Sequence, residues 1–246
     1  MAGDEPKNLA EGYVKTPHPV QGLPRVVRHI TGHNAEGKSV FLDTDVGDHH
    51  RVLGNGSAIT NIVYSTSNHP VQLNGDVDVK FARENEPGIT VKNGTVCRMI
   101  DFAPGAVSPM HRVNSLDYAI VLEGVFKMVL DSGEERIMQR GDIAVQRSTA
   151  HQWINVTGNG LLAGRMLFVL LDVQDVHIAG QKVEGYLGIL GKDYEGLPGH
   201  EKAGEAPAEQ TGAPTKVSQA PPVFAPAVHA ISSVGISSAD YFDSEF

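Results

Sequence analysis

Hydrophobic and polar positions alternate over short segments in the middle of the chain. Between residues 91 and 173, apolar runs of strand length, such as TVCRMIDF, DYAIVLEG and LLAGRMLFVLLDV, are separated by Pro-Gly, Ser-Gly and Arg-Gly turns. No segment in this part has a helical period. Many short strands at regular spacing predict an all-β fold, an antiparallel sandwich or barrel. The run 161–173 is apolar nearly throughout, so we expect it in the core.

The flanking parts of the chain have a different texture. Residues 25–90 carry shorter β-branched patches, RVVRHITG, SVFLDTD and AITNIVYST, so we predict one domain over 25–175 after a flexible lead-in, 1–24. The stretch VEGYLGILGKDYEGL predicts a short helix or a covering loop within 176–198. Residues 199–246 predict a low-complexity linker rich in Ala, Pro and Glu, followed by a tail that is apolar enough to dock.

The amino-acid composition restricts the classes of binding partner that we expect. The chain has 246 residues, of which 41% are apolar and 20% charged, so a core of useful size is available. The net charge of −9 argues against nucleic acid and anionic membranes as partners. The single Cys97 cannot form an internal disulfide, which fits a reducing compartment. With neither a secretory signal nor a transmembrane run in this sequence, we expect a cytoplasmic protein.

The chemistry-bearing residues cluster in the stretch PGAVSPMHRVNSLDYAIVLEG, residues 104–124. In an extended segment His111 and Val113 share a face, and Asp117 joins them after a short bend. His151 lies further along, with Trp153 on its face. Two histidines and one carboxylate are the ligand set of non-haem iron sites, and without metal they make an acid–base set. The residues alone leave both readings open.

The same stretch resembles the first motif of the cupin superfamily. Gly105, His111 and Gly124 are identical to the motif, Asp117 replaces its glutamate, and Val113 replaces its second histidine. The resemblance implies a jelly-roll β-barrel with a pocket at its mouth. Metal-binding cupins use both histidines and the glutamate of this motif, so this chain lacks a ligand at Val113 and has a shorter acid at Asp117.

A second motif strengthens the resemblance. In GDIAVQRSTAHQWIN, Gly141, His151 and Asn155 match the second cupin motif, whereas its proline is missing. This version is similar to small single-domain cupins of bacteria and of fungal secondary-metabolite clusters. His151 would be the last metal ligand. The resemblance therefore leaves two expectations for the cofactor: none, or one divalent metal (iron, zinc, manganese or nickel) on His111, Asp117 and His151.

Several residues have a plain structural alternative. His111 could be a buried histidine satisfied by Asp117, Asp117 could cap a turn with Asn114, and His151 could simply pack on Trp153. Arg147 either pairs with a carboxylate of the fold or binds a substrate group. As substrate-contacting residues we expect Met110, Val113, Arg147 and Trp153.

Three functions remain from the sequence. The first is an enzyme that modifies an aromatic or polyketide-like metabolite by dehydration, isomerisation or cyclisation, with His111, Asp117 and His151 as acid–base groups. The second is a metal-dependent oxidoreductase, and the third is a ligand-binding protein without chemistry. The expected partners are a small-molecule substrate and a second copy of the chain. Segment 25–60 or the tail 223–246 would contribute to this homodimer.

Overall fold

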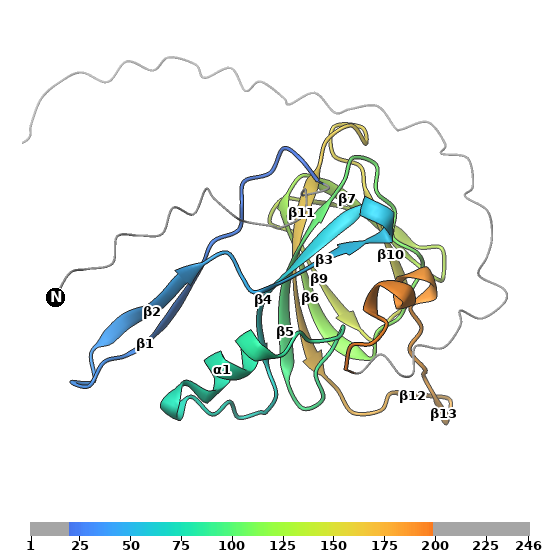
Figure 1. The fold of residues 1–246 in the computed structure, drawn as a ribbon. Coiled ribbons are helices and arrows are strands. Elements are labelled where there is room, and N and C mark those ends of the chain that lie inside the picture. Colours follow the sequence, from blue (N-terminus) through green and yellow to red (C-terminus); the bar gives the residue numbers. More distant parts are fainter. Residues whose placement is uncertain (1–19, 199–246) are drawn as a thin grey trace, which may run out of the picture. The chain divides into compact units, whose positions relative to one another are not determined.

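The computed structural model describes residues 20–198. Most of the predicted lead-in and all of the predicted tail from residue 199 onward lie outside these described residues. A strand-rich body forms the centre of the described part, and its strands form two main sheets and two small hairpins (Figure 1).

The larger sheet has six antiparallel strands. Their order across the sheet is β3 (His49–Leu53), β4 (Ala58–Thr66), β5 (Thr95–Phe102), β11 (Gly164–Asp172), β6 (Ser115–Glu123) and β9 (Ile143–Arg147). β11 lies between β5 and β6, and its residues Met166, Phe168 and Leu170 are buried. The prediction that the run 161–173 lies in the core is confirmed for these β11 residues, whereas Leu161 and Leu162, in the turn before β11, are exposed.

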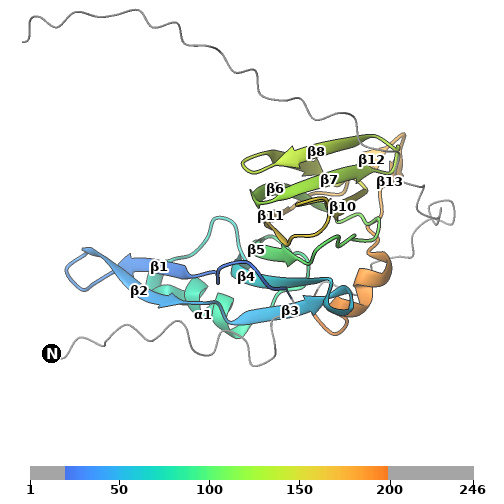
Figure 2. The same cartoon turned by 90° about the horizontal axis from the view of Figure 1, so that it is seen from above.

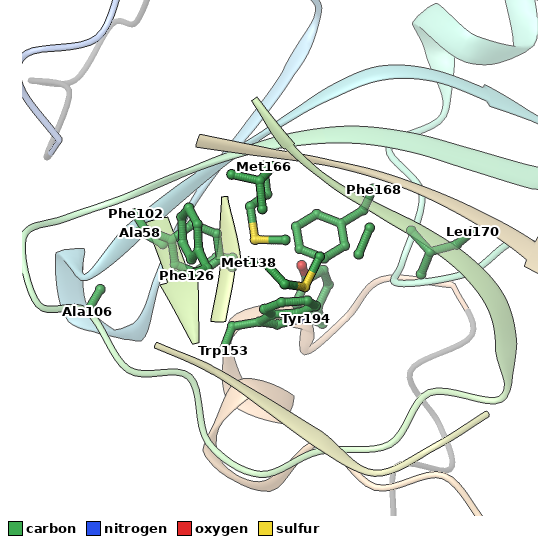
Figure 3. Packing of buried hydrophobic residues seen from close by; sticks show 13 residues of the cluster. Ala58, Phe102, Ala106, Phe126, Met138, Trp153, Met166, Phe168, Leu170 and Tyr194 are labelled. Atoms are coloured by element: carbon green, nitrogen blue, oxygen red, sulfur yellow. The ribbon is translucent and has the colours of Figure 1, made fainter. Parts of the chain in front are cut away.

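A three-stranded sheet supplies the other part of the core. It consists of β10 (His151–Asn155), β7 (Val125–Leu130) and β8 (Glu135–Gln139), in that order. The ring of Phe126 on β7 packs edge-on against Phe102 of β5, with centroids 5.1 Å apart. Figure 3 shows these two rings with Met138, Met166 and other side chains of the cluster. The predicted all-β sandwich or barrel is confirmed.

A hairpin and a helix precede this body. The hairpin pairs β1 (Arg28–His33) with β2 (Ser39–Asp45), and α1 (Val77–Glu84) lies beside it in both views (Figures 1 and 2). Arg83 of α1 pairs with Asp43 and Asp45 of β2. The sequence reasoning missed α1, because the apolar residues of VDVKFARE also alternate as in a strand. No helix in residues 20–198 has the length and apolar character that a membrane crossing requires.

The segment after the body contributes short elements. They are β12 (His177–Ile178), β13 (Gln181–Lys182) and the 3₁₀ helix η3 (Gly188–Tyr194); two further 3₁₀ turns, η1 (Gly54–Gly56) and η2 (Asn74–Asp76), flank β4 and α1. Arg51 of β3 donates to the backbone carbonyl of Asp193, and the Asp193 carboxylate accepts from the Gly54 N–H at 2.9 Å. These bonds hold η3 beside β3, where it lies in Figure 1.

Candidate active site

A cavity of about 280 Å³ lies between the strands and η3. Its wall is largely apolar: β5 and β11 contribute alternate side chains, among them Ile100, Phe102, Phe168 and Leu170. η3 closes part of it with Ile189, Leu190 and Tyr194. Such a space suits a small, largely apolar ligand held by a few polar groups.

His111 and His151 stand next to one another in the wall of this cavity. They form an antiparallel bridge in which the backbone N–H of each donates to the carbonyl of the other, at 3.0 and 2.9 Å. Side chains of such a directly opposed pair project to the same face of the sheet. The two rings are accordingly 4.3 Å apart, centroid to centroid.

The backbone fixes the tautomer of both rings. Nδ1 of His111 lies 2.9 Å from the carbonyl oxygen of Pro109, and Nδ1 of His151 lies 2.9 Å from that of Thr149. Because a carbonyl only accepts, each Nδ1 carries the hydrogen and each Nε2 keeps a free lone pair. Each residue therefore presents a potential base at Nε2.

Burial keeps both imidazoles neutral. Together with the smaller effect of the neighbouring His111, it lowers the pKa of His151 to about 3. Burial also lowers the pKa of His111. Charged imidazolium is costly away from water, and two such charges at this separation repel one another. At neutral pH the pair therefore consists of two uncharged bases.

Asp117 lies in the same cavity but on a different strand. It is 5% exposed on β6, and its Oδ1 has no hydrogen-bond partner. Burial raises the pKa of Asp117 to about 6, although the charge of Arg98 acts in the opposite direction. A carboxyl group with such a pKa exchanges protons near neutral pH, as a general acid or base requires. Neither histidine ring is oriented by Asp117, and Asp117 does not cap a turn, because it lies within a strand.

The predicted three-ligand metal set is not found. Among residues 20–198, no group of three or more His, Cys, Asp or Glu side chains lies close enough to hold a metal ion. His111 and His151 provide two imidazoles, whereas Asp117 is paired across the sheet with Gln146 and Leu170. The side chains of the described residues therefore do not fit a metal held by His111, Asp117 and His151, one of the two alternatives that the motif left open.

The structure places the predicted substrate-contacting residues in two groups. Val113 and Trp153 line the cavity, and the ring of Trp153 lies edge-on to that of His151 at 5.9 Å. Arg147 and Met110 do not line it. Arg147 is exposed on β9, because strand alternation turns its neighbour Gln146 inward instead.

Sequence reasoning missed Arg98 and Tyr194. Arg98 is 3% exposed on β5 and lines the cavity, and its Nη1 donates to Tyr194 Oη at 2.8 Å. A signal for Arg98 was present, because alternation in TVCRMIDF puts it on the same face as Val96 and Ile100. Tyr194 lies in the covering segment, whose sequence gives no period that would aim a side chain at the body. Figure 3 shows Tyr194 and Trp153 as members of the same buried cluster.

Comparisons with known proteins agree with this architecture, although no family model matches the chain. The chain is 70% identical over 179 residues to the cupin-domain-containing oxidoreductase fogC of Aspergillus ruber (strain CBS 135680), covering 73% of this chain and 88% of that protein. It is 42% identical over 171 residues to phomopsin biosynthesis cluster protein C' of Diaporthe leptostromiformis, covering 68% and 88%. Among solved structures, a RmlC-like cupin from Shewanella frigidimarina NCIMB 400 is 15% identical, with a TM-score of 0.33, over 52% of this chain and 86% of that one. On the identity and coverage of the curated relatives, the chain belongs to the cupin superfamily.

Proposed function

We propose that this protein is an enzyme that modifies a small aromatic or polyketide-like metabolite in its cavity by proton transfer. One observation carries the proposal: His111 and His151 present two neutral imidazoles, each with its hydrogen held at Nδ1, in the wall of an apolar cavity. The free Nε2 lone pair of a neutral imidazole can accept a proton from a bound substrate.

The names of the relatives support a role in tailoring a natural product. Phomopsin biosynthesis cluster protein C' and oryzines biosynthesis cluster protein J are both named for such clusters. The cavity of about 280 Å³ has a volume suited to a compact small molecule, and its apolar wall would exclude water from it.

Dehydration illustrates the chemistry that these groups supply. Nε2 of His111 or His151 takes the proton from a carbon beside a carbonyl, and protonated Asp117 gives its proton to the leaving hydroxyl. The C–H and C–O bonds break, the C–H electron pair forms the C=C bond, and water leaves. In an isomerisation the proton returns to another carbon and no atom is lost. In both cases Val113 contributes apolar wall where related motifs carry a ligand.

A second candidate function is oxidoreduction. It is favoured by the names of fogC and of three further relatives, each called a cupin-domain-containing oxidoreductase. The third function predicted from the sequence, ligand binding without turnover, has no observation in its favour.

The mass change of the substrate separates these functions. We would delete the gene in its native host, extract the metabolites that accumulate, and incubate the extract with the purified full-length protein. Proton-transfer chemistry predicts a product of equal mass, or one lighter by a single water. A product that differs by two hydrogens or gains oxygen would overturn the proposal in favour of oxidoreduction. If no compound in the extract is consumed, binding without turnover would be favoured.

A further inference from the structure

Arg98 differs from the other buried arginines of the described chain in what surrounds its charge. Arg28 is paired with Asp45 and Asp48, and Arg165 with both carboxylate oxygens of Asp101. No ion pair of Arg98 is found within residues 20–198, although it is as deeply buried as these two.

The partners of Arg98 are neutral oxygens. Its Nη2 donates to the backbone carbonyls of Gly88 and Ile89 at 2.8 and 2.6 Å, and its Nη1 donates to Tyr194 Oη. Its Nε has no hydrogen-bond partner among residues 20–198. A buried guanidinium without a counter-charge is costly, and a vacant buried donor adds to that cost. An anion supplied from outside the fold would provide the missing counter-charge.

The position of Arg98 in the fold indicates where such an anion would bind. On β5 it is flanked by Ile62 of β4 and Phe168 of β11, so the neighbouring strands supply no charge beside it. It lines the same cavity as the histidine pair. Asp117 also lines this cavity, and the charge of Arg98 acts to lower its pKa, but the two side chains form no direct ion pair.

Tyr194 completes the site. Its Oη accepts the hydrogen bond from Arg98, which leaves its own hydrogen free to be donated. The side chain comes from η3, so a ligand oxygen held by both residues would connect the covering helix to β5. Trp153 also lines the cavity, and its buried Nε1–H has no hydrogen-bond partner among residues 20–198.

We infer that Arg98 and Tyr194 form a binding site for an acidic oxygen of the substrate, a carboxylate or an enolate on an apolar body. The Arg98 guanidinium and the Tyr194 O–H would donate to this oxygen, while the apolar wall holds the remainder. Charge-assisted bonds of this kind are the strong ones in a buried site. The inference deepens the proposed function, because it names the chemical class of its substrate.

Binding of a matched pair of probes tests this inference. The full chain would be titrated with 4-phenylbutyrate and with its neutral amide, 4-phenylbutanamide, following the fluorescence of its single tryptophan, Trp153. We expect the acid to bind about tenfold more tightly than the amide or better, which is the range for a hydrogen bond to a charged group. Equal affinities, or no binding of the acid, would overturn the inference.

Variants assign the preference to the two residues. Arg98→Met should bind the acid and the amide equally, with its amide affinity unchanged, which also shows that the cavity remains folded. Arg98→Lys keeps the charge and should retain part of the preference, and Tyr194→Phe should reduce it. The control is Arg147→Met, an exposed arginine outside the cavity, which should behave as wild type. An undiminished acid preference in Arg98→Met would contradict the assignment.

The readout is independent of turnover. A preference for the acid that persists in His151→Gln, a variant expected to be inactive, would support the anion site whatever reaction the protein performs. Failure of the extract experiment with a retained acid preference would therefore count against the proposed reaction alone.

Discussion

His111 and His151 hold each other in place through two backbone hydrogen bonds, and their rings lie 4.3 Å apart. Each ring is also fixed by a backbone carbonyl two residues earlier, Pro109 for one and Thr149 for the other. The same local arrangement thus occurs twice, on segments brought together by the fold. Since no side chain orients either ring, the backbone presets both Nε2 atoms, and substitutions at other side chains leave the tautomer unchanged.

Replacement of either histidine should remove a base. We expect His111→Gln and His151→Gln each to lower kcat/KM by roughly 10²–10⁴-fold, the range for a lost general acid or base. Glutamine keeps an amide N–H that can bond to the backbone carbonyl, so folding is less disturbed than by alanine. Steady-state rates on the extract-derived substrate give the measurement. A loss smaller than threefold in both variants would rule out proton transfer by this pair.

The pH dependence should report Asp117. The proposed acid must carry its proton, and its pKa is raised to about 6, so kcat/KM should fall as the pH rises through about 6. The rate should fall on the acid side only when the histidines are protonated, well below their usual pKa. Asp117→Asn should lower kcat/KM roughly 100-fold and remove the alkaline limb. An alkaline limb that survives in Asp117→Asn would assign it to another group.

Much of the fold could be predicted from the sequence, because strands and turns are determined largely by short stretches of the chain. The strand-length runs between 91 and 173 became β5 to β11. Two motif residues serve the fold directly. Gly124 joins β6 to β7 with a φ of 93°, and a Cβ there would lie 2.2 Å from Thr157 Oγ1. Asn155 donates to the carbonyls of Ala103 and Leu162, which ties the end of β10 to two loops.

The site was only partly accessible, since it depends on contacts between distant segments. The motif spacing indicated His111, Asp117 and His151, and all three line one cavity. The motif spacing does not predict that Asp117 lies apart from the histidine pair, because this separation follows from the register of the strands. Nor could it find Tyr194, whose place depends on how η3 docks. Alternation in TVCRMIDF indicates which residues share a face with Arg98, but only the packed fold shows that this face, and not that of Arg147, is turned inward.

Stability should depend on pH through His151. Its pKa is lowered from 6.5 to about 3 in the folded protein, so between these values the unfolded chain binds a proton that the folded chain does not. The free energy of unfolding is therefore unaffected by protonation of His151 above pH 6.5, and it decreases as the pH falls from 6.5 toward 3. Between about pH 7 and pH 5, the free energy of unfolding should therefore drop more in wild type than in His151→Gln, by on the order of 1–3 kcal/mol.

Urea unfolding at the two pH values measures this difference. The pKa of Asp117 is raised on folding, so its contribution has the opposite sign and falls as the pH rises. Because Asp117 is present in both proteins, its contribution cancels in the comparison. Identical pH dependence of wild type and His151→Gln would show that His151 is not held neutral.

The homodimer expected from the sequence stays a prediction, and the β1–β2 hairpin is the part of segment 25–60 best suited to it. The hairpin forms a separate two-stranded sheet, and Phe41 on it is 72% exposed. Two-stranded hairpins are marginal without further packing, and a second copy would cover the aromatic ring. Light scattering at micromolar concentration should give twice the mass of one chain for wild type and a lower mass for Phe41→Asp. Val145→Asp, exposed on β9, is the control that should remain dimeric; a wild-type mass of one chain would contradict the prediction.

Val113→His tests why the cavity carries a valine where the cupin motif has a histidine. Val113 lines the cavity and follows His111 by two residues, so a histidine there would add an imidazole to the existing pair. Three imidazoles are a set that Zn²⁺ accepts, so the variant should bind Zn²⁺ more tightly than wild type in calorimetric titration. It should also lose activity, by roughly 100-fold, because the new ring occupies space shaped for substrate.

The matched control is Val113→Phe, which fills the same space without a ligand nitrogen. It should lose activity like Val113→His and gain no affinity for Zn²⁺, which separates the steric effect from metal binding. If Val113→His kept full activity, the valine would not be part of the substrate wall. If wild type and Val113→His bound Zn²⁺ equally, position 113 would not face the histidine pair, and the comparison of this site with the cupin motif would fail at that position.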